Sequence, residues 1–328
     1  MNSASKAVHQ IDHTGSGTEA LLTAFDAIVE HHYVDSDGVR IHYAAMAQGP
    51  LLVLLHGFPD HWLGWWQVMV DLCADHRVVA LDLRGYHLSD APADPQAYLP
   101  AALVADVAAV VEREGTGKAT LIGHDWGGFI AWHAAMQAQP WLERLIVLNM
   151  PHPWAIAREL SNNPQQRVAS DYVRAFRQPQ SHLQLPISGL GTWIKDAAFK
   201  RRHDQAMAVS KLETMLHYYR VNWPAEPYFM PGDMPHKVAV PTLLIHGLAD
   251  PYALPAGLND VWQWVDNALS IQTIPDAGHF IQHDNAQQVV RIVRTWLHQQ
   301  TGSSDQKTRQ TRQTPALPIK ELHSIFHT

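Results

Sequence analysis

The chain has 328 residues, 46% of them hydrophobic and 17% charged, a composition typical of a globular protein with a sizeable core. Its formal net charge of −7 provides no basic surface, so nucleic acid is not an expected partner. The single cysteine, Cys73, excludes an internal disulfide framework, and no apolar run is long enough to predict a membrane span.

The start of the chain, residues 1–28, is predicted to be a loosely ordered leader. It lacks the basic-then-apolar order of a signal peptide. Together with the lone cysteine, this favours a cytoplasmic location, because reducing compartments rarely use disulfides.

Residues 29–150 alternate short apolar runs with segments of helical periodicity, the pattern of a parallel sheet covered by helices on both faces. They open with a predicted β-hairpin over residues 33–43, which turns at Asp37-Gly38. The expected buried strands are 51–55, 78–83, 119–123 and 145–150, and the expected helices are 103–114 and 129–137.

The pattern changes over residues 151–236. These residues form aromatic-rich, helix-like segments separated by prolines, without a run typical of a buried strand. Strand character returns over 238–247 and 270–274, and residues 289–298 indicate a closing helix.

We therefore predict an α/β fold whose mostly parallel central sheet is flanked by helices. The first part of this core is residues 29–150 and the second part is residues 237–300. Residues 151–236 are predicted to be an inserted helical cap, and residues 301–328 a polar, disordered tail.

The segment with the most chemical information is residues 121–128, LIGHDWGG. An apolar strand, a glycine-flanked turn and a helix are expected here in that order, which is the context that lifts one side chain above a sheet as a nucleophile. The residue at the turn is Asp125. A carboxylate with a reference pKa of about 4 is already an anion and can attack a saturated carbon, whereas a serine would need a base and would favour esters. Asp125 therefore favours opening of an epoxide or displacement of a halide.

Such a nucleophile needs an acid–histidine pair later in the chain. Asp250 follows the predicted strand 238–247, and His279 lies in the loop before the closing helix, so the order nucleophile, acid, histidine is met. Asn149 occupies the alternative position for the acid but cannot carry the charge.

The 22 histidines do not predict a metal site. No His-Glu-x-x-His motif and no Cys/His ligand spacing is found among them. We expect neither a metal nor an organic cofactor.

Taken together, these motifs make residues 30–298 resemble the epoxide hydrolase branch of the α/β-hydrolase superfamily. His56-Gly57-Phe58-Pro59 is similar to the oxyanion-hole motif of that family. The resemblance implies that the backbone N–H groups of Phe58 and Trp126 form the oxyanion hole, and that a cis peptide bond precedes Pro59.

The resemblance also implies two cap tyrosines that bind the epoxide oxygen. The segment 170–179 matches the first at Tyr172, and the segment 216–223 matches the second at Tyr219, with Tyr218 as its rival. The implied reaction is hydrolysis of an epoxide to a vicinal diol. Asp125 forms an ester with a ring carbon, and His279, oriented by Asp250, activates the water that cleaves it. We expect the rate to fall as His279 is protonated below its reference pKa of about 6.5.

The expected partners are a small hydrophobic epoxide and water, and the sequence gives no oligomeric state. Tyr172, Tyr219, Phe58 and Trp126 are the predicted substrate-binding residues. A hydrophobic pocket is also expected from apolar cap residues, which are Trp154, Phe176, Leu183, Leu185 and Trp193.

Two further histidines receive no catalytic role, and the first of them departs from the family pattern. His87 stands where relatives carry a small or polar residue, and we expect it to cover its own loop. His152, beside Trp154 at the expected cap entrance, is likewise assigned no chemistry.

Other functions on the same fold remain open. A haloalkane dehalogenase shares the Asp–His–acid set but needs a second side-chain N–H donor for halide, which Phe58 lacks. A fluoroacetate dehalogenase would carry arginine at the position of Trp126. A non-catalytic binding protein commonly loses one of the three catalytic residues, and this chain has all three.

Overall fold

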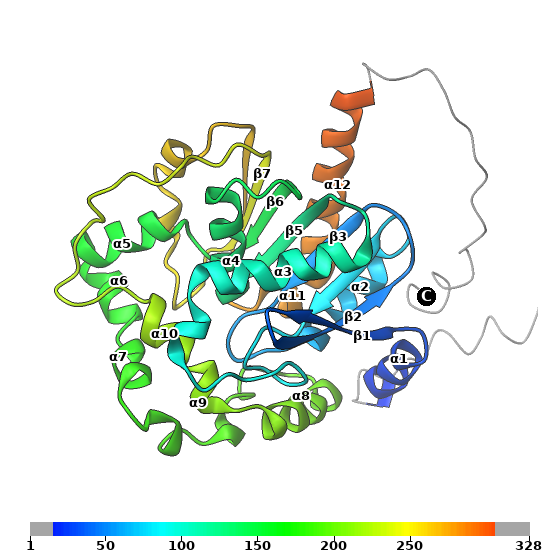
Figure 1. Cartoon of the computed structure of the whole chain (residues 1–328), viewed down its shortest axis with the longest axis horizontal. Helices are drawn as coiled ribbons and strands as arrows, with labels where there is room; N and C mark the ends of the chain where they lie inside the picture. Colours follow the sequence, from blue (N-terminus) through cyan, green and yellow to red (C-terminus); the bar gives the residue numbers. More distant parts are fainter. Residues whose placement is uncertain (1–15, 306–328) are drawn as a thin grey trace, which may run out of the picture.

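The computed structural model describes residues 16–305, which fold around one eight-stranded sheet with the strand order β1-β2-β4-β3-β5-β6-β7-β8 (Figure 1). The strands are β1 (Glu30–Ser36), β2 (Val39–Met46), β3 (Leu51–Leu55), β4 (Arg77–Leu81), β5 (Ala119–His124), β6 (Leu142–Leu148), β7 (Thr242–Gly247) and β8 (Leu269–Ile274).

The sheet is mostly parallel, as predicted. Only β1 and β2 run against their neighbours: β1 pairs antiparallel with β2, and β2 pairs antiparallel with β4. All pairs from β4 across to β8 are parallel. The hairpin turns at Asp37 and Gly38, which both have positive φ (51° and 80°), the geometry of a type I′ turn.

Helices cover both faces of this sheet, because its central strands are apolar on both sides. In β3, Leu51, Val53 and Leu55 belong to one hydrophobic cluster, together with residues of α3 (Pro100–Glu114) and α4 (Trp126–Met136). Leu52 and Leu54 belong to the opposite cluster, together with residues of α2 (Trp66–Leu72) and α12 (Ala286–Asp305).

Between β6 and β7 the chain forms helices and no strand over residues 151–236, all of which the structure describes. We call this stretch the cap segment. Its helices follow the left and lower border of the molecule in Figure 1. They are α5 (Pro153–Asn162), α6 (Pro164–Ala169), α7 (Tyr172–Arg177), α8 (Ala197–Val209), α9 (Leu212–Met215) and α10 (His217–Asn222).

The expectation of a loose leader over residues 1–28 is wrong for its described part. Residues Ser16–Asp26 form helix α1. Leu22 and Phe25 on this helix are completely buried, and the Phe25 ring stacks on Trp62 at 5.9 Å between centroids. Burial of these two side chains against the core therefore orders a segment that was expected to be loose. Residues 1–15 lie outside the described residues.

Two further boundaries differ from expectation. β7 begins at Thr242, directly after Pro241, which has no N–H to give to a ladder, and Val238 forms only an isolated bridge with Val265. The last helix, α12, continues to Asp305, past the predicted start of the polar tail at 301. The rest of that tail, residues 306–328, is not described.

Within residues 16–305, none of the helices combines the length and the apolar character that crossing a membrane requires.

Candidate active site

Asp125 stands at the sharp turn between β5 and α4, in a backbone conformation that side chains rarely adopt (φ 51°, ψ −121°). Close packing of glycines around the turn makes it possible. A Cβ on Gly123 would lie 2.3 Å from the carbonyl oxygen of Gly127, and one on Gly127 would lie 2.2 Å from that of Leu55. The glycines therefore let the start of α4 approach β3, and the turn presents the Asp125 carboxylate above the sheet.

The loop after β3, residues 56–60, which we call the oxyanion loop, faces this carboxylate. The backbone N–H of Phe58 donates to Oδ1 of Asp125 at 2.8 Å, and the Phe58–Pro59 peptide bond is cis. A Cβ on Gly57 would lie only 2.3 Å from Asp125 Oδ1, so only glycine fits there. Trp126, the other expected donor, is the first residue of α4.

The side chain of His56 fixes the start of this loop. Its Nε2 accepts the N–H of Leu83 at 3.1 Å, so the hydrogen of a neutral ring is on Nδ1. Nδ1 donates to the carbonyl oxygen of Gly57 at 2.9 Å. This bond orients the peptide that carries the Phe58 N–H.

His279 lies between two carboxylates. Its Nδ1 is 2.8 Å from Asp250 Oδ2, and its Nε2 is 3.6 Å from Asp125 Oδ2. Asp250 is buried, and its Oδ1 accepts the N–H groups of Tyr252 and Ala253 at 2.8 and 3.1 Å. The structure thus brings the three residues together in the order Asp250, His279, Asp125.

Asn149 supports this arrangement in a way that its sequence position did not reveal. Its Nδ2 donates to Asp250 Oδ2 at 2.6 Å and to the carbonyl oxygen of Gly278 at 3.1 Å. Its Oδ1 accepts the N–H of Gly247 at 3.2 Å. Asn149 therefore orients the acid instead of replacing it, which only the pairing of β6 with β7 makes visible.

The two carboxylates decide the charge of His279. Burial opposes the imidazolium, but the charge of Asp250, one hydrogen bond to each carboxylate and the charge of Asp125 outweigh it and raise the pKa of His279 to about 10. The same contacts lower the pKa of both carboxyl groups against the effect of their burial. His279 is therefore a cation at neutral pH in the resting site, and the reference pKa of about 6.5 does not describe it.

The structure separates the two rival tyrosines. Tyr218 is buried away from the site and donates its hydroxyl to the carbonyl oxygen of Arg84 at 3.0 Å. Tyr219 lines the cavity above Asp125, together with Tyr172, and the two rings lie 6.1 Å apart. Burial first, and then neighbouring charge, raises the pKa of both phenols, so both are protonated donors at neutral pH.

The cavity above Asp125 has a volume of about 250 Å³ and a mainly aromatic wall. Its lining residues come from loops that follow the strands of the sheet and from the cap segment, including helices α7 and α10. Its lining residues are Phe58, Pro59, Asp125, Tyr172, Phe176, Gly189, Leu190, Thr192, Trp193, Tyr219, Tyr252, His279 and Phe280.

The expected apolar cap residues do not all reach this cavity. Phe176 and Trp193 line it. The prediction for Leu183 is wrong, because 72% of its surface is exposed, and Leu185 packs against the core cluster outside the cavity. Trp154 lines a different cavity.

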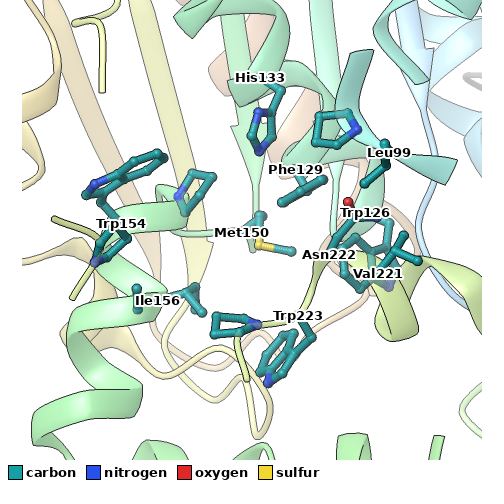
Figure 2. Close-up of a pocket in the computed structure, with 15 residues that line it drawn as sticks. Leu99, Trp126, Phe129, His133, Met150, Trp154, Ile156, Val221, Asn222 and Trp223 are labelled. Atoms are coloured by element: carbon teal, nitrogen blue, oxygen red, sulfur yellow. The ribbon is translucent and has the colours of Figure 1, made fainter. Parts of the chain in front are cut away.

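That second cavity has a volume of about 310 Å³ and lies between α4 and the cap segment (Figure 2). The two cavities share no lining residue, but Trp126, which lines the second, directly follows Asp125, which lines the first. Figure 2 shows Trp126 and Trp154 on opposite sides of it, with Phe129 and Met150 between them. The Trp126 ring lies 4.9 Å from the ring of Tyr219 and 5.1 Å from that of Phe129, so this side chain contacts one lining residue of each cavity.

Two further histidines that the sequence analysis considered, His87 and His152, line neither of these two cavities. His87 binds Asp82 through Nδ1 at 3.0 Å and does not line the cavity above Asp125. His152 accepts the N–H of Trp154 at the start of α5.

Tyr252, two residues after Asp250, was not predicted. It lines the cavity with its ring 5.2 Å from His279 and 5.5 Å from Tyr172.

Among residues 16–305, no group of three or more histidine, cysteine, aspartate or glutamate side chains is arranged to hold a metal ion.

Comparisons with known proteins agree with this architecture. Residues 50–286 match the family described as alpha/beta hydrolase fold. The chain is 31% identical to epoxide hydrolase 3 of Xenopus tropicalis over 82% of this chain and 78% of that protein. It is 30% identical to human epoxide hydrolase 4 over 84% of this chain and 81% of that protein.

Solved structures of an epoxide hydrolase are also similar to this chain. A mutant epoxide hydrolase from Bacillus megaterium is similar with a TM-score of 0.75 and 30% identity, covering 81% of this chain and all (100%) of that one. Another mutant of that enzyme, with a TM-score of 0.74 and the same identity and coverage, is complexed with a naphthyloxy-propanediol product.

Proposed function

Because the chain belongs to the epoxide hydrolases of the α/β-hydrolase superfamily, we propose that it hydrolyses an epoxide to a vicinal diol through an ester on Asp125. One observation supports this route above all. The Asp125 carboxylate faces a cavity lined by two protonated phenols, and the histidine of a histidine–carboxylate pair lies 3.6 Å from it.

In the first half-reaction, Asp125 attacks a ring carbon, and the bond from that carbon to the ring oxygen breaks. Tyr172 and Tyr219 donate hydrogen bonds to the oxygen as it becomes negative, which stabilises the transition state where charge develops. The product is a neutral hydroxyalkyl ester. Loss of the Asp125 charge lowers the pKa of His279, so the proton that the histidine releases balances the one that the alkoxide takes up.

In the second half-reaction, neutral His279 takes a proton from water, and the resulting hydroxide attacks the ester carbonyl of Asp125. Asp250 stabilises the imidazolium that forms. The N–H groups of Phe58 and Trp126 stabilise the negative oxygen of the tetrahedral intermediate. When the intermediate collapses, the diol leaves and the carboxylate of Asp125 is restored.

The substrate class follows from the cavity wall. Its aromatic side chains favour a small hydrophobic epoxide, bound with its oxygen toward the two phenols. The naphthyloxy-propanediol bound by the Bacillus megaterium relative supports including aryl ethers in a panel with styrene-like, terpene-like and fatty epoxides. Chiral analysis of the diols from this panel would define regioselectivity and enantioselectivity.

The covalent route is tested by one turnover with excess enzyme in oxygen-18 water. The diol should be unlabelled, because its new oxygen comes from Asp125, and the label should enter the protein. A heavily labelled diol would mean direct attack by water. In parallel, His279→Gln should accumulate the ester as a mass increase equal to the mass of the epoxide, whereas Asp125→Ala should form none.

A further inference from the structure

A hydrogen bond joins the cap segment to the backbone of the oxyanion loop. His203, on α8, places Nε2 2.5 Å from the carbonyl oxygen of Pro59. A carbonyl oxygen can only accept, so Nε2 carries the hydrogen and donates it. The ring is completely buried, and burial lowers the pKa of His203, which favours the neutral form with this single hydrogen.

The accepting carbonyl group of Pro59 lies next to the residue whose N–H binds Asp125. Pro59 directly follows Phe58, whose N–H donates to Asp125. Core residues hold the positions before and after Phe58 and Pro59. His56 binds the carbonyl oxygen of Gly57, and His283 binds the carboxylate of Asp60 at 2.7 Å. The bond from His203 adds a contact from the cap segment at the middle of the loop.

The position of the His203 ring depends on how the cap segment packs on the core. The ring lies 5.8 Å from His61 of the core and 5.7 Å from Trp193 of the cap segment. Trp193 in turn stacks on Phe280 at 3.8 Å, next to His279. The donor is therefore in place only when residues 193–203 are seated on the core.

We infer that His203 is a positioning residue for the second half-reaction, which it assists by holding the Phe58 N–H on the oxygen of Asp125 through its hydrogen bond to Pro59. The rate of ester hydrolysis then depends on how the cap segment packs on the core. This inference rests on the proposed function, because it requires the ester on Asp125.

The two half-reactions should respond differently to loss of this bond. Alkylation removes negative charge from Asp125, whereas attack of water returns negative charge to its carbonyl oxygen. In the first step the Phe58 N–H stabilises the reactant, which is the charged carboxylate of Asp125. In the second step it stabilises the negatively charged tetrahedral intermediate. A displaced N–H therefore slows hydrolysis and does not slow alkylation. A ring that only fills space would affect both steps through the shared geometry.

The test compares His203→Gln with His203→Met. Glutamine can place an N–H near the position of Nε2, and methionine has nearly the same shape without a donor. His203→Leu is a second variant without a donor, so misfolding of one leaves the comparison intact. Thermal unfolding checks each fold. Rapid-quench mass spectrometry measures formation and decay of the ester with the epoxide of the panel that the wild type turns over fastest.

We expect His203→Met and His203→Leu to hydrolyse the ester about 10- to 100-fold more slowly, as small misplacements of catalytic groups do. Ester formation should not slow, and His203→Gln should resemble the wild type in both steps. The inference is overturned if the donorless variants hydrolyse the ester at the wild-type rate, if both steps slow alike, or if His203→Gln behaves like His203→Met. Failure to trap any ester in His279→Gln would instead refute the proposed function.

Discussion

At the level of single residues, the proposed mechanism assigns two different acid–base tasks to groups in the same small cavity. The carboxylate of Asp125 must be charged to attack, and His279 must be neutral to activate water. Their mutual contact keeps His279 protonated while Asp125 is free, and alkylation of Asp125 removes that contact. In the proposed mechanism, His279 thus becomes available as a base only after the ester bond has formed.

This coupling predicts the pH dependence of the second half-reaction. In the ester, only Asp250 and burial act on His279, so its pKa should lie below the value of about 10 in the resting site. The hydrolysis rate in single-turnover experiments should rise with pH and level off below pH 10, and a rate independent of pH would contradict the role of His279. A direct NMR titration of the resting His279 ring should give the higher pKa.

The two phenols give a second prediction at this scale. Tyr172→Phe and Tyr219→Phe should each slow ester formation, by up to about 100-fold, since each removes one preorganised donor. Loss of both should slow it further. Tyr218→Phe is the matched control, because its hydroxyl binds Arg84 and not the cavity. Equal alkylation rates in Tyr218→Phe and Tyr219→Phe would contradict the proposed role of Tyr219.

At the level of elements, the close approach of the β3 loop to the β5–α4 turn creates the site. Gly57→Ala should reduce alkylation and hydrolysis by at least about 100-fold, because its Cβ would displace both Asp125 and the N–H of Phe58. Gly232→Ala is the control, since a Cβ added there would meet no atom within 4 Å and the φ of Gly232 is not positive. Steady-state rates and thermal unfolding of both variants would separate a local from a global effect, and normal turnover by Gly57→Ala would contradict the geometry.

The sequence did not predict helix α1, and the contribution of its packing to stability can be measured. Phe25→Ala should lower the free energy of unfolding by about 3–5 kcal/mol, because a completely buried aromatic ring is lost from contact with Trp62. Glu19→Gln removes exposed ion pairs with Arg201 and Arg202 on α8 and should have little effect. Equal stability of the wild type and Phe25→Ala in urea would show that α1 does not dock in solution.

For the whole molecule, the raised pKa of His279 links the site to stability. The unfolded histidine has a pKa of about 6.5, so its contribution is complete below that pH and is lost as pH rises through about 10. Between these values, the wild type should lose stability relative to His279→Gln by about 1.4 kcal/mol per pH unit. Urea unfolding of both proteins at several pH values measures the difference, and a constant difference across this window would refute the shift.

The sequence by itself was sufficient to predict much of the fold and three residues of the candidate site. Apolar runs and helical periodicity predicted most of the sheet and the helices that cover it, because buried strands and amphipathic helices must each present a hydrophobic surface. Local sequence around Asp125, Asp250 and His279 identified three residues that the structure places together. Turn chemistry and chain order carry this information without any knowledge of contacts.

Only the tertiary structure could decide the rest, since those features depend on residues far apart in the chain. Packing of Leu22 and Phe25 ordered α1, and two neighbouring tyrosines acquired different partners because α10 turns one ring toward the cavity and the other toward Arg84. The charge of His279 is set by two carboxylates 154 and 29 positions earlier in the chain (279 − 125 and 279 − 250). Burial and electrostatic interactions act through space, and a linear sequence does not contain those distances.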